Sequence, residues 1–161
     1  MGEQLVHILT GPVRSGKTTA LLSIFEKVQK NGGILTPVTA GRRVFMDVEN
    51  GTFFPMEATD DDTAVFRVGR FSFSKAGFEK ASAIIRSAVP VTGWLVIDEI
   101  GPLELNGDGF SDVLKGVLAL RKEKILLVVR EGLAEKVRDH FGIFNSTVIG
   151  IADLEQLILK K

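Results

Sequence analysis

The fold is decided by the stretch Gly11-Pro12-Val13-Arg14-Ser15-Gly16-Lys17-Thr18. It fits the phosphate-binding pattern G-x-x-x-x-G-K-[ST] at every fixed position. Gly11 and Gly16 allow the backbone to wrap closely around an anion, where a Cβ would block the turn. Lys17 can reach the β and γ phosphates, and the Thr18 hydroxyl is a suitable oxygen ligand for Mg²⁺. The stretch therefore predicts a loop that holds a nucleoside triphosphate.

The segments on either side of this loop fit the structural setting that the pattern requires. Residues 5–10 form a short apolar run that is typical of a buried strand. Apolar residues at 21, 24, 25 and 28 have helical spacing, so a helix is expected after the loop, ended by Asn-Gly-Gly at 31–33. The predicted nucleotide-binding residues are Gly11, Pro12, Val13, Arg14, Ser15, Gly16, Lys17, Thr18 and Thr19.

Composition and charge favour one globular domain over residues 1–161. Hydrophobic residues make up 45% and charged residues 25%, as in soluble proteins with a sizeable core. The formal net charge is zero, so no overall field would draw the chain to nucleic acid or an anionic membrane. The absence of cysteine excludes disulfides and thiolate metal sites, and favours a cytoplasmic location. Residues 1–4 do not resemble the start of a secretory signal, and no apolar run approaches the ~20 residues of a membrane span.

The remaining pattern predicts an alternating α/β protein with a β-rich insertion at about residues 43–73. Asn50-Gly51 is a strong hairpin signal inside that insertion. Ser74 is a plausible N-cap for the helix that follows it. Strands are expected at 34–38, 44–48, 52–56, 64–68, 70–73, 94–97, 125–129 and 147–149, and helices at 78–88, 111–120, 133–141 and 153–159. The alternation predicts a mostly parallel sheet with helices on both faces.

A second functional signal is the pair Asp98-Glu99, which follows the apolar run at 94–97. Ligands of open parallel sheets bind beyond the carboxyl ends of the strands, so both carboxylates should face the phosphate loop if their strands are neighbours. Asp98 would then hold Mg²⁺ opposite Thr18. Glu99 would orient or deprotonate the water that attacks the γ phosphate. Acids that merely solvate a strand end are the alternative.

These residues resemble a known family. The loop G-P-V-R-S-G-K-T-T, the segment 41–45 and the stretch D-E-I-G-P-L-E at 98–104 are similar to the small P-loop nucleoside-triphosphatases of the thermophilic phosphatase type, whose acidic strand end reads D-E-I-G-x-[ML]-E. The resemblance implies a RecA-like P-loop fold and slow Mg²⁺-dependent hydrolysis of ATP, GTP and related triphosphates. The loop departs from the family pattern at Val13 and Arg14, where a glycine is common.

Several further residues have two open interpretations. Glu104 is either a second acid that orients a positive group or a surface charge. Arg130 follows the strand at 125–129 and would stabilise charge on the γ phosphate, or else be exposed. Arg14, Arg42 and Arg43 would contact phosphate or face solvent. The acidic run 60–62 favours a solvated turn, and the two histidines give no zinc signature.

The sequence thus predicts an enzyme that converts a nucleoside triphosphate and water into a diphosphate and phosphate. The predicted catalytic residues are Lys17, Glu99 and Arg130, and the predicted ligands of Mg²⁺ are Thr18 and Asp98. A small-molecule kinase is one alternative, although a dense arginine lid is missing. The other is a non-enzymatic, nucleotide-dependent adaptor in cofactor biosynthesis. Base preference, oligomeric state and any protein partner are not predicted.

Overall fold

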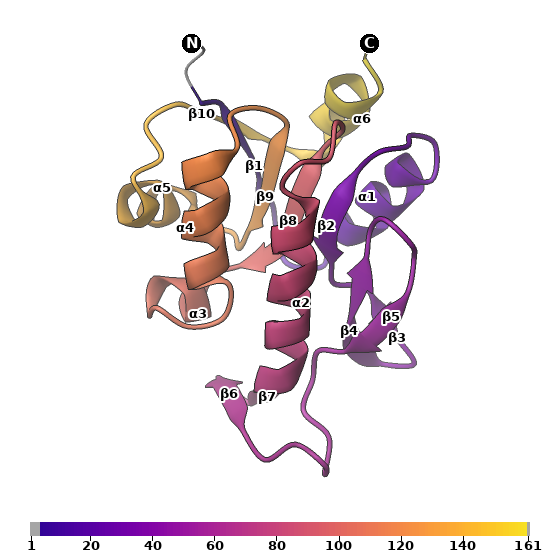
Figure 1. The fold of residues 1–161 in the computed structure, drawn as a ribbon, viewed down its shortest axis with the longest axis vertical. Helices are drawn as coiled ribbons and strands as arrows, with labels where there is room; N and C mark the ends of the chain where they lie inside the picture. Colours follow the sequence, from indigo (N-terminus) through magenta and orange to yellow (C-terminus); the bar gives the residue numbers. More distant parts are fainter. Residues whose placement is uncertain (1–3, 161) are drawn as a thin grey trace.

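The computed structural model describes residues 4–160, so residues 1–3, which include most of the segment tested for a signal sequence, and residue 161 lie outside the description. A β-sheet forms the centre and helices cover both of its faces (Figure 1). The strands are β1 Val6–Leu9, β2 Gly32–Leu35, β3 Val38–Thr39, β4 Arg42–Asp47, β5 Phe53–Pro55, β6 Val65–Val68, β7 Phe71–Ser74, β8 Leu95–Ile100, β9 Ile125–Val129 and β10 Ser146–Ile149. The helices are α1 Lys17–Phe25, α2 Lys75–Ala88, α3 Pro102–Leu105, α4 Ser111–Leu120, α5 Ala134–Phe141 and α6 Ile151–Leu159.

The main sheet has the strand order β10-β1-β9-β8-β2-β4-β3, with β5 paired to β4. Strands β10, β1, β9, β8 and β2 are parallel to one another, whereas β4 pairs with β2 in the antiparallel sense. The predicted mostly parallel sheet is therefore confirmed. The strand that precedes the phosphate loop and the strand that carries Asp98 are not neighbours, because β9 lies between them.

Side chains of the central strands alternate between two hydrophobic cores. Ile97 and Leu127 belong to the core beneath α2, α4 and α5, whereas Val96 and Leu126 belong to the core beneath α1 and α6. This period of two arises because successive side chains of a strand point to opposite faces. Near-continuous apolar runs are needed where both faces are covered, which explains the composition of β8 and β9.

The segment after the phosphate loop differs from the expectation. Helix α1 begins at Lys17 and ends at Phe25, before Val28. The prediction that 31–33 ends this helix is wrong, because Gly32 and Gly33 begin β2. Gly33 has φ +108°, and a Cβ there would collide with the carbonyl oxygen of Val96 on β8. A glycine is therefore required by the close contact between β2 and β8.

The β-rich insertion forms as predicted, but it is divided between two sheets. The hairpin of β4 and β5 extends the main sheet, and β6 pairs with β7 in a separate two-stranded sheet. Ser74 caps α2 by accepting a hydrogen bond from the amide of Gly77. Asp153, expected from the sequence to cap the last helix, is not the N-cap of α6: Gly150 is, and Asp153 lies three residues later and accepts a hydrogen bond from the Gly150 amide. Among residues 4–160 no helix is both long enough and apolar enough to cross a bilayer.

Candidate functional site

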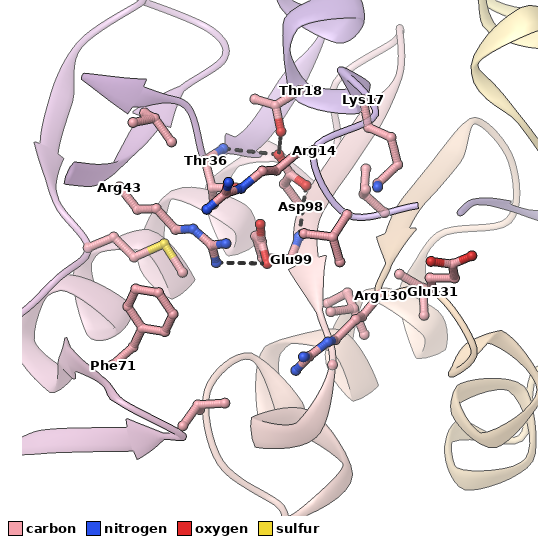
Figure 2. Close-up of a pocket in the computed structure, with 18 of the residues that line it drawn as sticks. Arg14, Lys17, Thr18, Thr36, Arg43, Phe71, Asp98, Glu99, Arg130 and Glu131 are labelled. Carbon is pink, nitrogen blue, oxygen red and sulfur yellow. Dashed lines mark hydrogen bonds and ion pairs between the residues drawn. The ribbon is translucent and has the colours of Figure 1, made fainter. Parts of the chain in front are cut away.

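A cavity of about 690 Å³ lies at the carboxyl ends of β8 and β9, next to the phosphate loop (Figure 2). Ligands of open α/β sheets bind at this edge because the loops that follow parallel strands meet there. Its walls come from the phosphate loop, the ends of β2, β8 and β9, and the β6–β7 hairpin. The predicted site residues on these walls are Gly11, Val13, Arg14, Ser15, Gly16, Lys17, Thr18, Thr19, Asp98, Glu99 and Arg130. Pro12 belongs to the same loop but does not line the cavity.

The phosphate loop leaves the start of α1 available for an anion. Gly16 is the N-cap with φ +88°, and no side chain caps the helix. No acidic residue occurs in the first turn of α1. The first amides of a helix without such caps attract negative charge. The ammonium group of Lys17 lies within the loop and donates to the carbonyl oxygens of Gly11 and Pro12, at 3.0 Å each.

Thr18 and Asp98 meet although β9 separates their strands. The Thr18 hydroxyl donates to Oδ2 of Asp98 at 2.9 Å, and the amide of Thr36 donates to the same oxygen at 3.1 Å. The phosphate loop between β1 and α1 spans the intervening β9, because Thr18 at the start of α1 contacts Asp98 on β8. The two predicted magnesium ligands are therefore adjacent in space.

An irregularity in β8 sets the orientation of the Glu99 side chain. The register between β8 and β9 shifts after Ile97, so that the next paired residue is Ile100. Two residues of β8 thus stand opposite one of β9, which is a β-bulge. Glu99 has φ +61°, a left-handed conformation that is rare for a residue with a side chain. This conformation turns the Glu99 carboxylate into the cavity beside Asp98 rather than into the core.

The two acids share an electrostatic environment that suits a cation. Burial raises the pKa of Asp98, and hydrogen bonds from Thr18, Thr36 and the amide of Glu99 oppose that effect. Burial, followed by repulsion from Asp98, raises the pKa of Glu99, while Arg43 and Lys17 act in the opposite direction. Asp98 is 1% exposed, and among residues 4–160 it has no ion-pair partner. A nearby cation would stabilise the ionised form of both acids.

The donor atoms fit a hard divalent cation, the class to which magnesium belongs. The Thr18 hydroxyl and an Asp98 carboxylate oxygen are hard oxygen ligands. Within the described chain no group of three or more acidic, histidine or cysteine side chains is placed to hold a metal alone. Magnesium commonly uses one or two protein oxygens and completes its shell with phosphate oxygens and water. Thr18 and Asp98 therefore suit a metal that arrives with a triphosphate.

Arg43 is the arginine that contacts Glu99. Its guanidinium lies 3.3 Å from Oε2 of Glu99, and Figure 2 shows the two side chains pointing toward one another. The sequence allowed either phosphate contact or exposure to solvent for Arg43; in the structure Arg43 is partly exposed and lies outside the phosphate loop. Arg42, its neighbour, instead donates to the carbonyl oxygen of Ala58. Strand alternation in β4 is the signal that separates these two arginines.

Arg130 and Arg14 also line the cavity, but neither is paired with an acid within residues 4–160. Arg130 is exposed at the end of β9, and its guanidinium lies apart from Lys17 and Asp98 in Figure 2. Its amide donates to the carbonyl oxygen of Ile100 at 2.9 Å, which fixes the backbone beside the bulge. Arg14 is exposed, with φ +61°.

Glu104 is not a surface charge, and it does not orient a positive group. Its two carboxylate oxygens accept hydrogen bonds from the amides of Gly101 and Phe110, at 2.8 and 3.0 Å. Burial raises the pKa of Glu104 to about 7. Through these two hydrogen bonds the side chain connects the start of α3 to the start of α4. It supports the segment that directly follows Glu99.

The other acidic and basic candidates lie outside the site. Asp62 is part of a turn, as expected, and accepts hydrogen bonds from the amide of Thr59 and the hydroxyl of Ser74. His7 packs edge-on against Trp94, with 5.2 Å between the ring centroids. His140 lies in the last turn of α5. These positions agree with the structural interpretations of the sequence.

Comparisons with known proteins identify the family of the chain. A family model described as NTPase matches residues 6–150. A relative named nucleoside-triphosphatase THEP1, from Methanopyrus kandleri, is 29% identical over 122 residues. The match covers 67% of this chain and 64% of that relative, so the chain spans less than two thirds of the relative's length.

Two solved structures share the fold. A human cancer-related nucleoside triphosphatase superposes with a TM-score of 0.71 at 23% identity, covering 98% of this chain and 96% of the other. The THEP1 crystal structure from the hyperthermophile Aquifex aeolicus gives a TM-score of 0.68 at 19% identity, covering 96% and 99%. At these identities the likeness establishes the P-loop NTPase fold alone.

Proposed function

This chain belongs to the NTPase family whose model matches residues 6–150, and from that membership we propose that it hydrolyses nucleoside triphosphates to diphosphates and phosphate with the help of Mg²⁺. The observation that carries the proposal is the contact between Thr18 and Asp98, with Glu99 next to Asp98. A phosphate loop alone would support binding. A carboxylate that could accept a proton from water beside the γ phosphate would in addition support hydrolysis.

The loop and Lys17 supply the binding step. Amides of residues 13–18 would surround the β phosphate, and the start of α1 adds partial positive charge. Lys17 would exchange its contacts with the carbonyl oxygens of Gly11 and Pro12 for oxygens of the β and γ phosphates. Thr18 and Asp98 would hold Mg²⁺, which when bound neutralises phosphate charge and fixes the triphosphate geometry.

Glu99 supplies the chemical step in this proposal. Its carboxylate would accept a proton from a water that attacks the γ phosphorus in line with the bond to the β phosphate. Arg43 contacts the same carboxylate and would hold its orientation. Arg130 is the proposed source of positive charge for the transition state, because it lines the cavity near Glu99.

The test is the rate of phosphate release over a panel of nucleoside triphosphates, with and without Mg²⁺. Glu99→Gln should lower the turnover rate by about 100-fold or more while nucleotide binding persists, because only proton transfer is lost. Lys17→Ala should weaken nucleotide binding itself. Glu79→Gln removes an exposed carboxylate of α2 outside the cavity and serves as the matched control. Wild-type turnover in Glu99→Gln would overturn the assigned role of Glu99.

Two other outcomes would point to the alternatives. Conversion of the triphosphate to the diphosphate only in the presence of a small acceptor, with the phosphoryl group recovered on that acceptor and no free phosphate released, would identify a kinase. Tight nucleotide binding without turnover across the whole panel would identify a nucleotide-dependent adaptor. Each result is distinct from the multiple-turnover hydrolysis that we expect.

A further inference from the structure

The cavity extends well past the predicted phosphate position. Beyond Glu99, seen from Lys17, its wall continues through Arg43 to Phe71 (Figure 2). We call this part the outer compartment. Its wall consists of residues from β4, the segment after β5, the β6–β7 hairpin and α2, namely Arg43, Met56, Val68, Arg70, Phe71, Phe73 and Phe78.

In the proposed reaction, the outer compartment would lie on the side from which the γ phosphate is attacked. In-line displacement places the nucleophile opposite the bond to the β phosphate, and therefore on the side away from the phosphate loop. Glu99, the proposed base, would be on that side, and the Arg43 guanidinium lies 3.3 Å from its carboxylate. The compartment would therefore be next to the attacking water, on the side of the γ phosphate opposite the phosphate loop.

The wall combines an apolar surface with positive charge. Met56, Phe73 and Phe78 are buried, while Phe71 is half-buried and presents its ring to the cavity. The guanidinium carbons of Arg70 and Arg43 lie 5.1 and 5.6 Å from the centroid of the Phe71 ring. Among residues 4–160, Glu99 is the one acid that forms an ion pair with either arginine, and its partner is Arg43; Glu57 accepts a hydrogen bond from the backbone amide of Arg43. Arg70 is exposed and has no acidic partner among residues 4–160.

We propose that the outer compartment binds a second ligand, a small organic anion with a flat apolar body, at the same time as the nucleoside triphosphate. The flat body would lie against Phe71 and Met56, since aromatic rings and thioethers favour such contacts. The anionic group would pair with Arg70, whose planar guanidinium suits carboxylate, sulfonate or phosphate oxygens. The placement beside the γ phosphate rests on the proposed function, whereas the ligand chemistry rests on the wall residues.

The proposal can be tested with 8-anilinonaphthalene-1-sulfonate, an aromatic anion whose fluorescence rises in apolar surroundings. The dye is titrated into the protein alone and into the protein saturated with Mg²⁺ and the non-hydrolysable β,γ-imido analogue of ATP. We expect saturable binding in both cases, with dissociation constants that agree within about twofold. Arg70→Gln and Phe71→Ala should each weaken dye binding by about fivefold or more.

Two matched variants control for the loss of a positive charge and for the loss of an aromatic ring. Arg67→Gln removes an exposed arginine from the same hairpin, and Phe53→Ala removes an exposed phenylalanine from β5; neither residue lines the cavity. Both should bind the dye as the wild type does. Arg70 is exposed, so Arg70→Gln is expected to fold even if Phe71→Ala does not.

Three results would overturn the proposal. They are the absence of saturable dye binding, an equal loss in Arg67→Gln and Arg70→Gln, and competitive displacement of the dye by the ATP analogue. The last result would assign the compartment to the nucleotide itself. The dye titration without nucleotide requires no hydrolysis, so a failure of the proposed NTPase activity would remain distinguishable from a failure of the second-ligand site.

Discussion

Glu104 shows how one buried carboxyl group can make stability depend on pH. It is 1% exposed, and its hydrogen-bond donors are the amides of Gly101 and Phe110 rather than a cation. Two amides do not compensate fully for the loss of water around a charge, so burial raises the pKa of Glu104 to about 7 from an ordinary 4.5. The folded protein therefore favours the protonated side chain.

We predict that this group stabilises the fold in acid and loses its contribution as the pH rises. Its stabilisation is complete below pH 4.5 and disappears as the pH passes about 7, because the folded state binds the proton more tightly than the unfolded state does. At about 1.4 kcal/mol per pKa unit, the free energy of unfolding should fall by about 3 kcal/mol across this window.

The measurement is urea unfolding at a series of pH values, compared between the wild type and Glu104→Gln. The difference in unfolding free energy between the two proteins should change across pH 4.5 to 7, since the amide cannot titrate. Glu79→Gln, at an exposed position on α2, should leave the profile unchanged. A wild-type and a Glu104→Gln profile that run parallel would contradict the prediction.

At the scale of the elements, two glycines should respond to alanine in opposite ways. Gly33 has φ +108° and lies against the Val96 backbone, so Gly33→Ala should lower the free energy of unfolding by about 3 kcal/mol. Gly116 lies inside α4, and no atom would crowd a Cβ there, so Gly116→Ala should raise the free energy of unfolding by about 0.5–1 kcal/mol.

Chemical denaturation measures the change in unfolding free energy for each variant. If the two substitutions change it in the same direction, the assigned contact of β2 with β8 is wrong.

Arg121 connects α4, β9 and the segment before β8 from the end of the sheet opposite the phosphate loop. Its guanidinium donates to the carbonyl oxygens of Val89 and Val91, at 2.8 and 2.7 Å, and also to that of Gly93. The side chain is 8% exposed. Lysine cannot reproduce a planar fork of donors, so carbonyl groups would lose their partners.

We therefore predict that Arg121→Lys lowers the free energy of unfolding by about 1–3 kcal/mol. Phosphate release per folded molecule should stay at the wild-type level, because Arg121 lies far from the cavity in the fold. Lys122→Gln changes the exposed neighbour and should shift stability by less than about 0.5 kcal/mol. If Arg121→Lys unfolds at the same denaturant concentration as the wild type, the hydrogen bonds of the guanidinium contribute nothing.

For the molecule as a whole, periodicity predicted most of the fold. Apolar spacing predicted the strands at 94–97 and 125–129 and the helix at 111–120. It did so because an element buried on one or both faces needs apolar residues at regular positions in the sequence. The roles of Gly32 and Gly33 did not follow, because a glycine that ends a helix and a glycine that permits close strand packing look the same in one sequence. The strand order could not be predicted either, because β9 follows β8 in the sequence but lies between β1 and β8 in the sheet.

The predicted site residues Lys17, Thr18, Asp98 and Glu99 meet at one cavity, because motifs at the carboxyl ends of parallel strands converge there. The pairing of Arg43 with Glu99 was not predictable, because it depends on a β-bulge and on how the insertion folds back toward β8. Contacts between segments distant in the chain leave no local pattern. This is also why the outer compartment became visible only in three dimensions.

The last prediction concerns how the whole fold responds to its ligand. A ligand that binds only the folded state at 100 times its dissociation constant adds about 2.7 kcal/mol of stability. For a domain of this size that corresponds to a rise in Tm of about 5–10 °C. The β,γ-imido analogue of ATP should produce this rise in the presence of Mg²⁺, and chelation with EDTA should reduce it, because Asp98 and the phosphates would then repel one another. Lys17→Ala, measured by the same thermal scan, should show little rise; a full rise in that variant would place the triphosphate outside the loop at 11–18.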